Sequence, residues 1–577
     1  MRVTKDLACG VSRASLVCAF ILLAACGGGG GGGGGGSPAA PPTTAAPPVS
    51  TKPTPSDASR FLSQATFGAT DADISSVTSS GYADWINTQL AMPVGASHLD
   101  LMDARLASMK TTNAGASLGT IHFYETFYSQ AVTAPDQLRQ RVKFALSEIF
   151  VTSMAADNIN LRTNASFYDM LGRDAFGNFR TLLQDVTYHP AMGQYLTYLS
   201  NQKENTATGR NPDENYAREL MQLFTIGLYE LNDDGSVKTD LFGKPIATYS
   251  TADIQGLAKV FTGLSWYHPA PTNSTFFGGN RDASAYTRPM IAYPNYHSVS
   301  QKAFLGTTIA ASSTVNADSE VSTALDTLFN HPNVGPFISK QLIQRLVTSN
   351  PSRDYVKRVA GVFNNNGSGV RGDMSAVIRA ILLDPEARTV SGDPDYGKLR
   401  EPVIRLTHFL RAFEATCTSG NWAISSTTAQ TSLNQAPLTS PSVFNFFRPG
   451  YTPPNTALGS RNKAVPEMQI ADEVSTAAYV NFMMNAINGG FNYSDIKSNY
   501  TKEIVLASDP SALVNRLNLL LYGGQMSDGL KSKIVTVITS ISIPATGSDV
   551  QIEAAKLNRV KLAILLSMAS PEYVAQR

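Results

Sequence analysis

The residues of this chain best suited to chemistry are two carboxylates, an arginine and a histidine. Glu219 and Asp253 could serve as the acid and the base of a hydrolase, and Arg218 and His297 could assist them. A hydrolase of this kind needs its two carboxylates at a defined separation in one pocket. If the protein is an enzyme, we therefore expect these four side chains to converge on one concave site.

No motif in the sequence indicates a metal or a cofactor. The chain contains no His-Glu-x-x-His or Cys-x-x-Cys motif, no calcium-loop spacing, no phosphate loop and no Gly-x-Ser-x-Gly elbow. Its seven histidines are spread along the chain, and an isolated histidine is more often structural than a ligand. We expect neither a metal site nor a cofactor.

The segment 211–227 is predicted to be a helix with a strong capping pattern at its start. Asn211 can cap the first turn, and Pro212 suits the first helical position. Glu214 stands where it can complete a capping box, and Gly227 is typical of a helix end.

The face of this helix opposite its apolar side carries the chemistry-bearing residues. Glu214 with Arg218, and Asn215 with Glu219, are each four residues apart and can pair. Two interpretations follow. The residues favour a solvated face on which Glu214 is a cap and Arg218 its ion-pair partner. Alternatively, the face lines a cleft in which Glu214 and Asn215 bind a sugar, a cation or a peptide.

Asp253 has two possible roles. Ser250 and Asp253 have the spacing of a capping box at the start of a predicted helix 250–262. At helical pitch, Asp253 falls on the apolar side of that helix, where a carboxylate must be hydrogen-bonded or paired. The pattern favours capping, and the alternative is a pair with Arg218.

Helical periodicity recurs along the rest of the chain. Capping residues precede apolar residues at spacings of three and four, and Gly or Pro follows. The predicted helices begin near Ser56 and at Thr70, and then occupy 81–92, 117–132, 135–153, 174–187, 211–226, 250–262, 318–330, 332–348, 371–384, 398–415, 464–487, 509–521 and 549–569. A β-hairpin is predicted over 228–239, and 265–310 has the composition of a long irregular insertion. The sequence thus predicts one large, mainly α body over 57–577.

Short strings along this body resemble one bacterial family. They are Arg60–Gly68, Gly81–Trp85, Arg141–Val151, Glu214–Leu220, Leu223–Gly227, Thr251–Ile254, Phe261–Gly263, His297 with Lys302, Leu305–Gly306 and Ser440–Phe447. Over roughly residues 57–570 the chain resembles the family numbered 1800 among the domains of unknown function. The resemblance implies export and a mostly helical fold, with no established activity.

The resemblance also bears on a site and on a partner. Family members often have Asp after the histidine of the insertion, whereas Ser298 follows His297 here, so a site that used that Asp would be altered. The genes of the family often stand beside a gene for an exported protein of the family numbered 1501 in the same series. The resemblance therefore implies such an exported protein as a partner.

The N-terminus is typical of a lipoprotein. A basic start precedes the apolar run Ala14–Ala25, which is shorter than the roughly 20 residues that span a bilayer and suits a signal peptide. The run ends at Cys26 in a pattern that resembles a bacterial lipobox. We expect cleavage after residue 25, lipid on Cys26 as the membrane anchor, and a Gly- and Pro-rich tether over 26–56. Gly27, in place of Asp, favours the outer membrane.

The balanced charge of the chain excludes non-specific nucleic-acid binding as its function. With 46 basic and 45 acidic residues, the chain lacks the excess of positive charge that nucleic-acid binding requires. Two hypotheses remain. The preferred one is a binding or assembly component of the cell envelope, because a lipid and a tether suit a docking protein. The alternative is a hydrolase acting on an envelope or extracellular polymer through a carboxylate cluster.

Overall fold

The computed structural model describes residues 52–156 and 159–577. The predicted signal peptide, Cys26 and most of the predicted tether lie outside these residues. The first described helix, α1, begins at Pro55, and its cap is Thr54 rather than the predicted Ser56. Thr54 is the better cap because its hydroxyl accepts a hydrogen bond from the Asp57 N–H, while the Asp57 carboxylate reaches back to the cap.

The N-terminal half of the described chain is helical throughout. Its helices are α1 (Pro55–Ala65), α2 (Asp71–Ser80), α3 (Tyr82–Ala91), α4 (His98–Thr112), α5 (Thr120–Thr133), α6 (Gln137–Ser147), α7 (Leu161–Asp174), α8 (Phe179–Tyr188), α9 (Pro190–Tyr195), α10 (Asn215–Glu219), the π-helix η1 (Leu220–Thr225) and α11 (Thr251–Val260). In the core between these helices, Phe67, which follows α1, packs edge to face on Phe127 of α5 and Phe144 of α6, and Phe127 also contacts Tyr168 of α7.

The C-terminal half continues the helical pattern. It contains α12 (Asn273–Phe276), η2 (Ala283–Tyr286), η3 (Pro294–Tyr296), α13 (Ala317–Asn330), α14 (Val334–Leu346), α15 (Arg353–Asn364), α16 (Met374–Leu383), α17 (Pro385–Arg388), α18 (Pro402–Ala412), α19 (Ala457–Ser460), η4 (Pro466–Ile470), α20 (Glu473–Gly489), α21 (Thr501–Leu506), α22 (Pro510–Tyr522), α23 (Asp528–Thr539), α24 (Asp549–Met568) and α25 (Pro571–Val574). None of the described helices is both long enough and apolar enough to cross a membrane.

Strands in the described chain are short and pair two by two. The antiparallel pairs are β1 (Leu264–Ser265) with β2 (Ile291–Ala292), β3 (Lys302–Phe304) with β4 (Thr307–Ile309), β5 (Lys398–Leu399) with β8 (Ala575–Gln576), and β6 (Thr416–Cys417) with β7 (Ile496–Lys497). The fold is therefore mainly α, as predicted, and the insertion over 265–310 holds only short elements.

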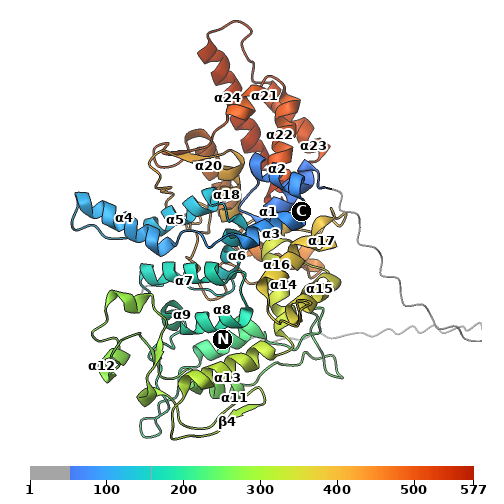
Figure 1. Cartoon of the computed structure of the whole chain (residues 1–577). Helices are drawn as coiled ribbons and strands as arrows, with labels where there is room; N and C mark the ends of the chain where they lie inside the picture. Colours follow the sequence, from blue (N-terminus) through green and yellow to red (C-terminus); the bar gives the residue numbers. More distant parts are fainter. Residues whose placement is uncertain (1–51, 157–158) are drawn as a thin grey trace, which may run out of the picture. The chain divides into compact units, whose positions relative to one another are not determined.

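The two ends of the described chain lie together. α1 packs against α22, and the blue N-terminal helices stand beside the orange and red C-terminal ones (Figure 1). The last strand, β8, closes against β5, and the Gln576 amide donates hydrogen bonds to the carbonyls of Leu346 and Val347 at the end of α14. The C-terminus is thus tied to α14, the helix that carries the cleft described below.

The predicted hairpin forms, held by isolated bridges instead of continuous strands. Leu231 pairs with Val237 across a turn, and a third segment adds bridges from Tyr229 to Ala247 and from Thr239 to Pro245. We call residues 228–248 the hairpin. Its base is fixed by Asn333, whose side chain bonds the Leu231 N–H (2.9 Å) and the Tyr229 carbonyl (2.8 Å).

The predicted helix 211–226 is wrong in its first turn and in its type. α10 begins only at Asn215, so Asn211 does not cap it, Pro212 is not its first residue, and Glu214 forms no capping box. Asp213 takes the capping role, because its carboxylate accepts the Asn215 N–H at 2.8 Å. After Glu219 the helix widens into η1, a π-helix, and such turns are frequent beside functional sites.

Candidate functional site

The predicted pair of Glu214 and Arg218 forms, and it is a surface contact. The Arg218 guanidinium donates to Glu214 Oε2 at 3.2 Å, with both side chains about a third or more exposed. Exposed pairs of this spacing contribute about 0.3–0.5 kcal/mol. The Asn215 side chain instead donates to the Thr197 hydroxyl at 3.5 Å, so its predicted pair with Glu219 does not form.

Glu219 is inside the protein. Only 8% of it is exposed, and its Oε2 has no hydrogen-bond partner among the described residues. Burial raises the pKa of Glu219, while the neighbouring Arg218 opposes that shift. Glu219 is therefore not part of a solvated face, because the side chain turns inward where α10 passes into η1.

Asp253 acts as a cap, as the capping pattern predicts. Its Oδ2 accepts hydrogen bonds from the Ser250 N–H and hydroxyl, each at 2.7 Å. Its other oxygen accepts the Leu305 N–H at 2.7 Å, and thereby holds the turn between β3 and β4 against α11. Burial would raise the pKa of Asp253, but these hydrogen bonds outweigh it and lower the pKa. Asp253 is thus occupied by the fold and does not pair with Arg218.

His297 belongs to a buried polar cluster in the insertion. Its Nδ1 lies 2.7 Å from the Thr262 carbonyl, and its Nε2 lies 2.9 Å from Glu320 Oε2. The Lys302 ammonium contacts the same carboxylate oxygen at 2.7 Å. Because every polar atom of the ring is engaged and the side chain is fully buried, His297 has a positioning role in this part of the fold.

The structure does not bring the predicted site residues together. Glu214 and Arg218 pair with each other, whereas Asp253 and His297 bond other parts of the fold. None of these residues, nor Glu219, borders the cleft that α14 lines. The same helix nevertheless reaches that cleft at its C-terminal end, where Gln222, Leu223 and Gly227 form part of the wall.

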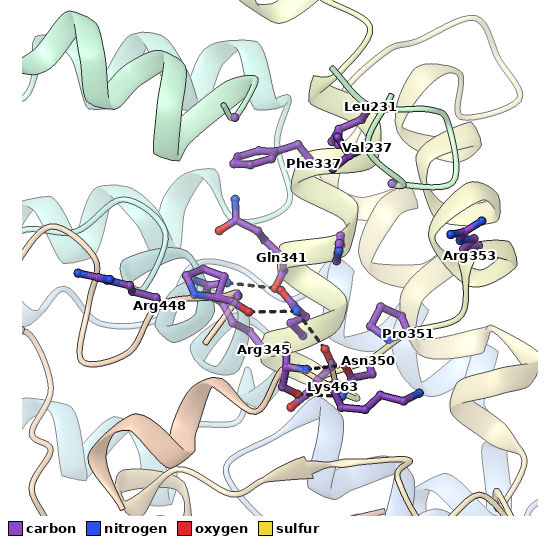
Figure 2. A pocket seen from close by; sticks show the side chains of 18 of the residues that line it. Leu231, Val237, Phe337, Gln341, Arg345, Asn350, Pro351, Arg353, Arg448 and Lys463 are labelled. Carbon is purple, nitrogen blue, oxygen red and sulfur yellow. Dashed lines mark hydrogen bonds between the residues drawn. The ribbon is translucent and has the colours of Figure 1, made fainter. Parts of the chain in front are cut away.

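This cleft has a volume of about 1110 Å³ and is built from segments far apart in the sequence. α14 forms its central wall, where Phe337, Gln341 and Arg345 lie in one row at four-residue spacing (Figure 2). The hairpin contributes an apolar side, which consists of Leu228, Tyr229, Leu231 and Val237. The loops around 350 and over 443–464 complete the opposite side.

Four basic side chains border the cleft and form no ion pair within 4.0 Å with an acidic side chain of the described residues. They are Lys340, Arg353, Arg448 and Lys463. The Arg448 guanidinium lies over the Phe444 ring, with its Cζ 5.1 Å from the ring centroid. Arg461, by contrast, is already paired with Asp395 at 2.5 Å. We call the first four residues the free cations of the cleft.

Hydrogen bonds fix the loop around 350 and the loop over 443–464, which carries Arg448 and Lys463. The Asn350 side chain donates to the Ala464 carbonyl at 2.8 Å and accepts the Ala464 N–H at 2.9 Å. The Gln344 amide donates to the carbonyls of Ser349 (3.0 Å) and Pro449 (3.3 Å). These bonds connect α14 to both loops, so the basic side of the cleft is organised before any ligand arrives.

A buried charge network lies behind α14. The Lys398 ammonium is 3.1 Å from Glu467 and 3.5 Å from Glu401, and it donates to the Arg345 carbonyl at 2.8 Å. Arg345 donates to the Glu148 carbonyl at 2.9 Å and lies 3.9 Å from the Glu148 carboxyl. Of these five residues, Glu148 and Arg345 also border the cleft.

The pKa values of Glu148 and Glu401 are shifted in opposite directions within this network. Burial and the adjacent Glu401 carboxylate raise the pKa of Glu148 well above its usual range. Burial would also raise the pKa of Glu401, but Lys398 and the hydrogen bond from Glu148 lower it. Glu148 is therefore the member of this pair that is held toward its neutral form, and the Asn445 amide donates to its Oε1 at 3.1 Å.

Sequence reasoning missed this network, although one signal was present. Glu148, together with Ser147, interrupts the apolar run Phe144–Val151, which predicts a buried carboxyl in need of a partner. Nothing comparable marks Arg345 or the free cations, since surface lysines and arginines occur throughout the chain. Within the described residues, no group of three His, Cys, Asp or Glu side chains could hold a metal ion.

A family model matches residues 60–575, which is most of the chain. The chain belongs to the family described as Protein of unknown function (DUF1800). No curated protein and no solved structure matches it. The DUF1800 match extends from α1 to β8, and so it includes the cleft, the hairpin and the buried charge network.

Proposed function

We propose that this protein is a lipid-anchored component of the cell envelope whose cleft binds an acidic segment of another exported polypeptide. The observation that carries the proposal is the cleft itself, whose lining combines four free cations with the apolar residues of the hairpin. Cys26 would hold the protein to the outer membrane through lipid, and the tether 26–56 would give the body reach.

The charge of the cleft supports an anionic ligand. Its lining has six basic side chains and three acidic ones; they are Lys340, Arg345, Arg353, Arg448, Arg461 and Lys463 against Glu148, Glu386 and Asp393. Two of the acidic groups already have partners inside the protein, because Glu148 accepts a hydrogen bond from the Asn445 amide and Glu386 accepts one from the Ser352 N–H. A cleft lined by one sign of charge focuses its field and attracts the opposite sign.

The shape and the apolar side support a polypeptide. The volume exceeds the range of about 300–1000 Å³ typical of small-molecule pockets. Leu231, Val237 and Phe337 offer apolar surface at one end of the cleft, and Lys463 lies toward the other end (Figure 2). A peptide with acidic and apolar side chains satisfies both sides at once. The exported family numbered 1501 is the candidate source of this segment, on the resemblance alone.

Photo-cross-linking tests this proposal. p-Benzoylphenylalanine is placed at position 337 in the cleft, and at the fully exposed position 493 as a control, in cells that produce the protein. We expect a protease-sensitive polypeptide adduct from 337 and none from 493. Equal adducts from both positions, or no polypeptide adduct from 337, would refute the proposal.

A hydrolase acting on an envelope polymer is the second candidate, and one observation favours it. Glu148 borders the cleft, and burial together with the adjacent Glu401 carboxylate raises its pKa well above the usual range, as the acid of a hydrolase requires. For this candidate, Glu148→Gln abolishes the release of soluble fragments from envelope polymers while leaving cross-linking at position 337 intact. Release that persists in Glu148→Gln excludes Glu148 as the acid.

A further inference from the structure

Two of the most exposed large hydrophobic side chains of the described chain stand together at one end of the hairpin. Leu241 is 100% exposed and Phe242 is 94% exposed. They occupy the turn 240–244, which connects the second and third segments of the hairpin. We call these two residues the apolar tip.

The turn holds the apolar tip in a fixed conformation. The Asp240 carboxylate accepts the N–H groups of Phe242 (2.8 Å) and Lys244 (2.9 Å). The Asp240 N–H donates to the Lys244 carbonyl at 2.9 Å, and the Gly243 N–H donates to the Asp240 carbonyl at 3.0 Å. Since these four hydrogen bonds fix the backbone of the turn, the exposure of the tip is a property of the fold.

Two such side chains contribute nothing to stability while they are in water. Burying a Leu or Phe side chain is worth about 1.5–3 kcal/mol, and the fold leaves that free energy unused at both positions. Exposed apolar groups that are held in place mark surfaces that a partner covers.

The apolar tip continues the apolar side of the cleft. Leu228, Tyr229 and Val237 border the cleft and are themselves about half exposed. Val237 precedes Leu241 by four residues, which at about 3.3 Å per extended residue places the tip within roughly 13 Å of the cleft wall. A single extended segment can therefore contact both.

The charges near the tip favour a polypeptide over a lipid surface. Lys238 lies 3.4 Å from Glu230, and within the turn the charge of Asp240 offsets that of Lys244, so the charges at the tip are balanced. A surface that binds anionic lipid headgroups carries clustered basic residues instead. The free cations lie on the cleft side, where an acidic polypeptide would reach them.

We infer that Leu241 and Phe242 are the apolar end of the docking surface whose acid-binding part is the cleft. The occupant is one exported polypeptide that places an acidic segment in the cleft and an apolar patch over the tip. This inference rests on the proposed function, because the same polypeptide fills both parts.

Paired cross-linking tests the inference in cells that produce the full chain. p-Benzoylphenylalanine at position 242 is expected to capture the same polypeptide as position 337. The double variant Leu241→Ser/Phe242→Ser is expected to lower the yield of the 337 adduct at least fivefold. Its thermal midpoint should equal that of the unmodified protein, because the removed side chains are already in water. The matched control is Val505→Ser/Val550→Ser, which removes two other exposed apolar side chains and should change nothing.

The outcomes separate this inference from the proposed function. A polypeptide adduct at 337 combined with a lipid, a different polypeptide or no adduct at 242 overturns the inference alone. An unchanged 337 yield in the double variant also overturns it. Absence of a polypeptide adduct at 337 in the otherwise unmodified protein overturns the proposed function, and the inference with it.

Discussion

Single carboxylates in this protein divide into those that hold the fold and those that face the cleft. Asp253 belongs to the first group, since it caps α11 and bonds the turn between β3 and β4. Glu148 belongs to both, because it joins the buried network and borders the cleft. The two residues therefore respond differently to substitution.

Asp253→Ala is expected to destabilise the protein by about 1–3 kcal/mol through the lost cap and the unpaired Leu305 N–H. Chemical denaturation followed by circular dichroism measures this difference. Asp549→Ala, at an exposed first-turn position of α24 that caps nothing, is the control and should cost less than about 0.5 kcal/mol. Equal stability of the two variants would contradict the structural role of Asp253.

Glu148→Gln is expected to change the pH dependence of stability. The raised pKa of Glu148 means that its stabilising contribution is complete below about 4.3, the unfolded value, and is lost as pH rises toward the folded value. Gln keeps the hydrogen bonds to Glu401 and Asn445 without ionising. The thermal midpoint of the variant, relative to the unmodified protein, should therefore be higher at pH 8 than at pH 4.

The exposed Glu553→Gln is the control for that measurement, because Glu553 forms only a surface pair with Lys556 at 3.0 Å. Its difference from the unmodified protein should not vary over the same pH range. A Glu148→Gln difference that is equally flat would show that Glu148 is ionised in the folded protein.

At the scale of elements, α11 and β3 approach each other so closely that position 256 must be glycine. A Cβ on Gly256 would lie 1.8 Å from the Ala303 carbonyl oxygen, so no side chain fits there. Gly256→Ala is expected to destabilise the fold by about 1–3 kcal/mol through overpacking. Gly361→Ala, within α15 and with open space around it, should instead stabilise by about 0.5–1 kcal/mol. Thermal denaturation of both variants checks the opposite signs, and a stabilising Gly256→Ala would contradict the packing.

Helices with clear caps could be predicted from the sequence, and less amphipathic ones could not. Thr70 and Gly81 bound α2 as predicted, because both ends carry local signals. α4 was not predicted, since only His98 and Met102 of that helix are buried and no apolar periodicity results. The predicted helix over 464–487 is two elements, because the Asp472 carboxylate accepts the Ser475 N–H and starts α20 afresh.

The π-helix η1 lay beyond sequence reasoning for a different reason. Its residues have the ordinary spacing of an α-helix, and the wider turn depends on tertiary contacts. The Thr225 hydroxyl bonds the Leu220 carbonyl at 2.5 Å, and the Gln341 amide reaches the Leu223 carbonyl at 3.5 Å from α14. A pattern within one segment does not record such contacts.

At the scale of the whole molecule, the cleft joins side chains that are distant in the sequence. Lys340 stands on α14, Arg353 begins α15, and Lys463 follows a loop more than a hundred residues later. Composition shows a balanced chain, yet the fold concentrates free cations on one side of the cleft. The candidate site could therefore not be located before the structure, whereas the mainly α fold could.

Binding of a fluorescently labelled oligoglutamate peptide to the full chain in detergent tests the central claim most directly. The cleft variant combines Lys340→Gln, Arg353→Gln and Lys463→Gln. The matched control removes three cations from remote exposed sites or surface pairs, Lys110→Gln, Lys531→Gln and Lys556→Gln.

We predict that the cleft variant binds the peptide about 10- to 100-fold more weakly than the unmodified protein, as expected for three charge contacts of about 0.5–1 kcal/mol each. The control variant should lose less than about twofold, and binding to the unmodified protein should weaken from about 0.01 to 1 M salt as the screening length falls from about 30 to 3 Å. Equal loss in both variants, or affinity that salt leaves unchanged, would contradict an anion-binding cleft.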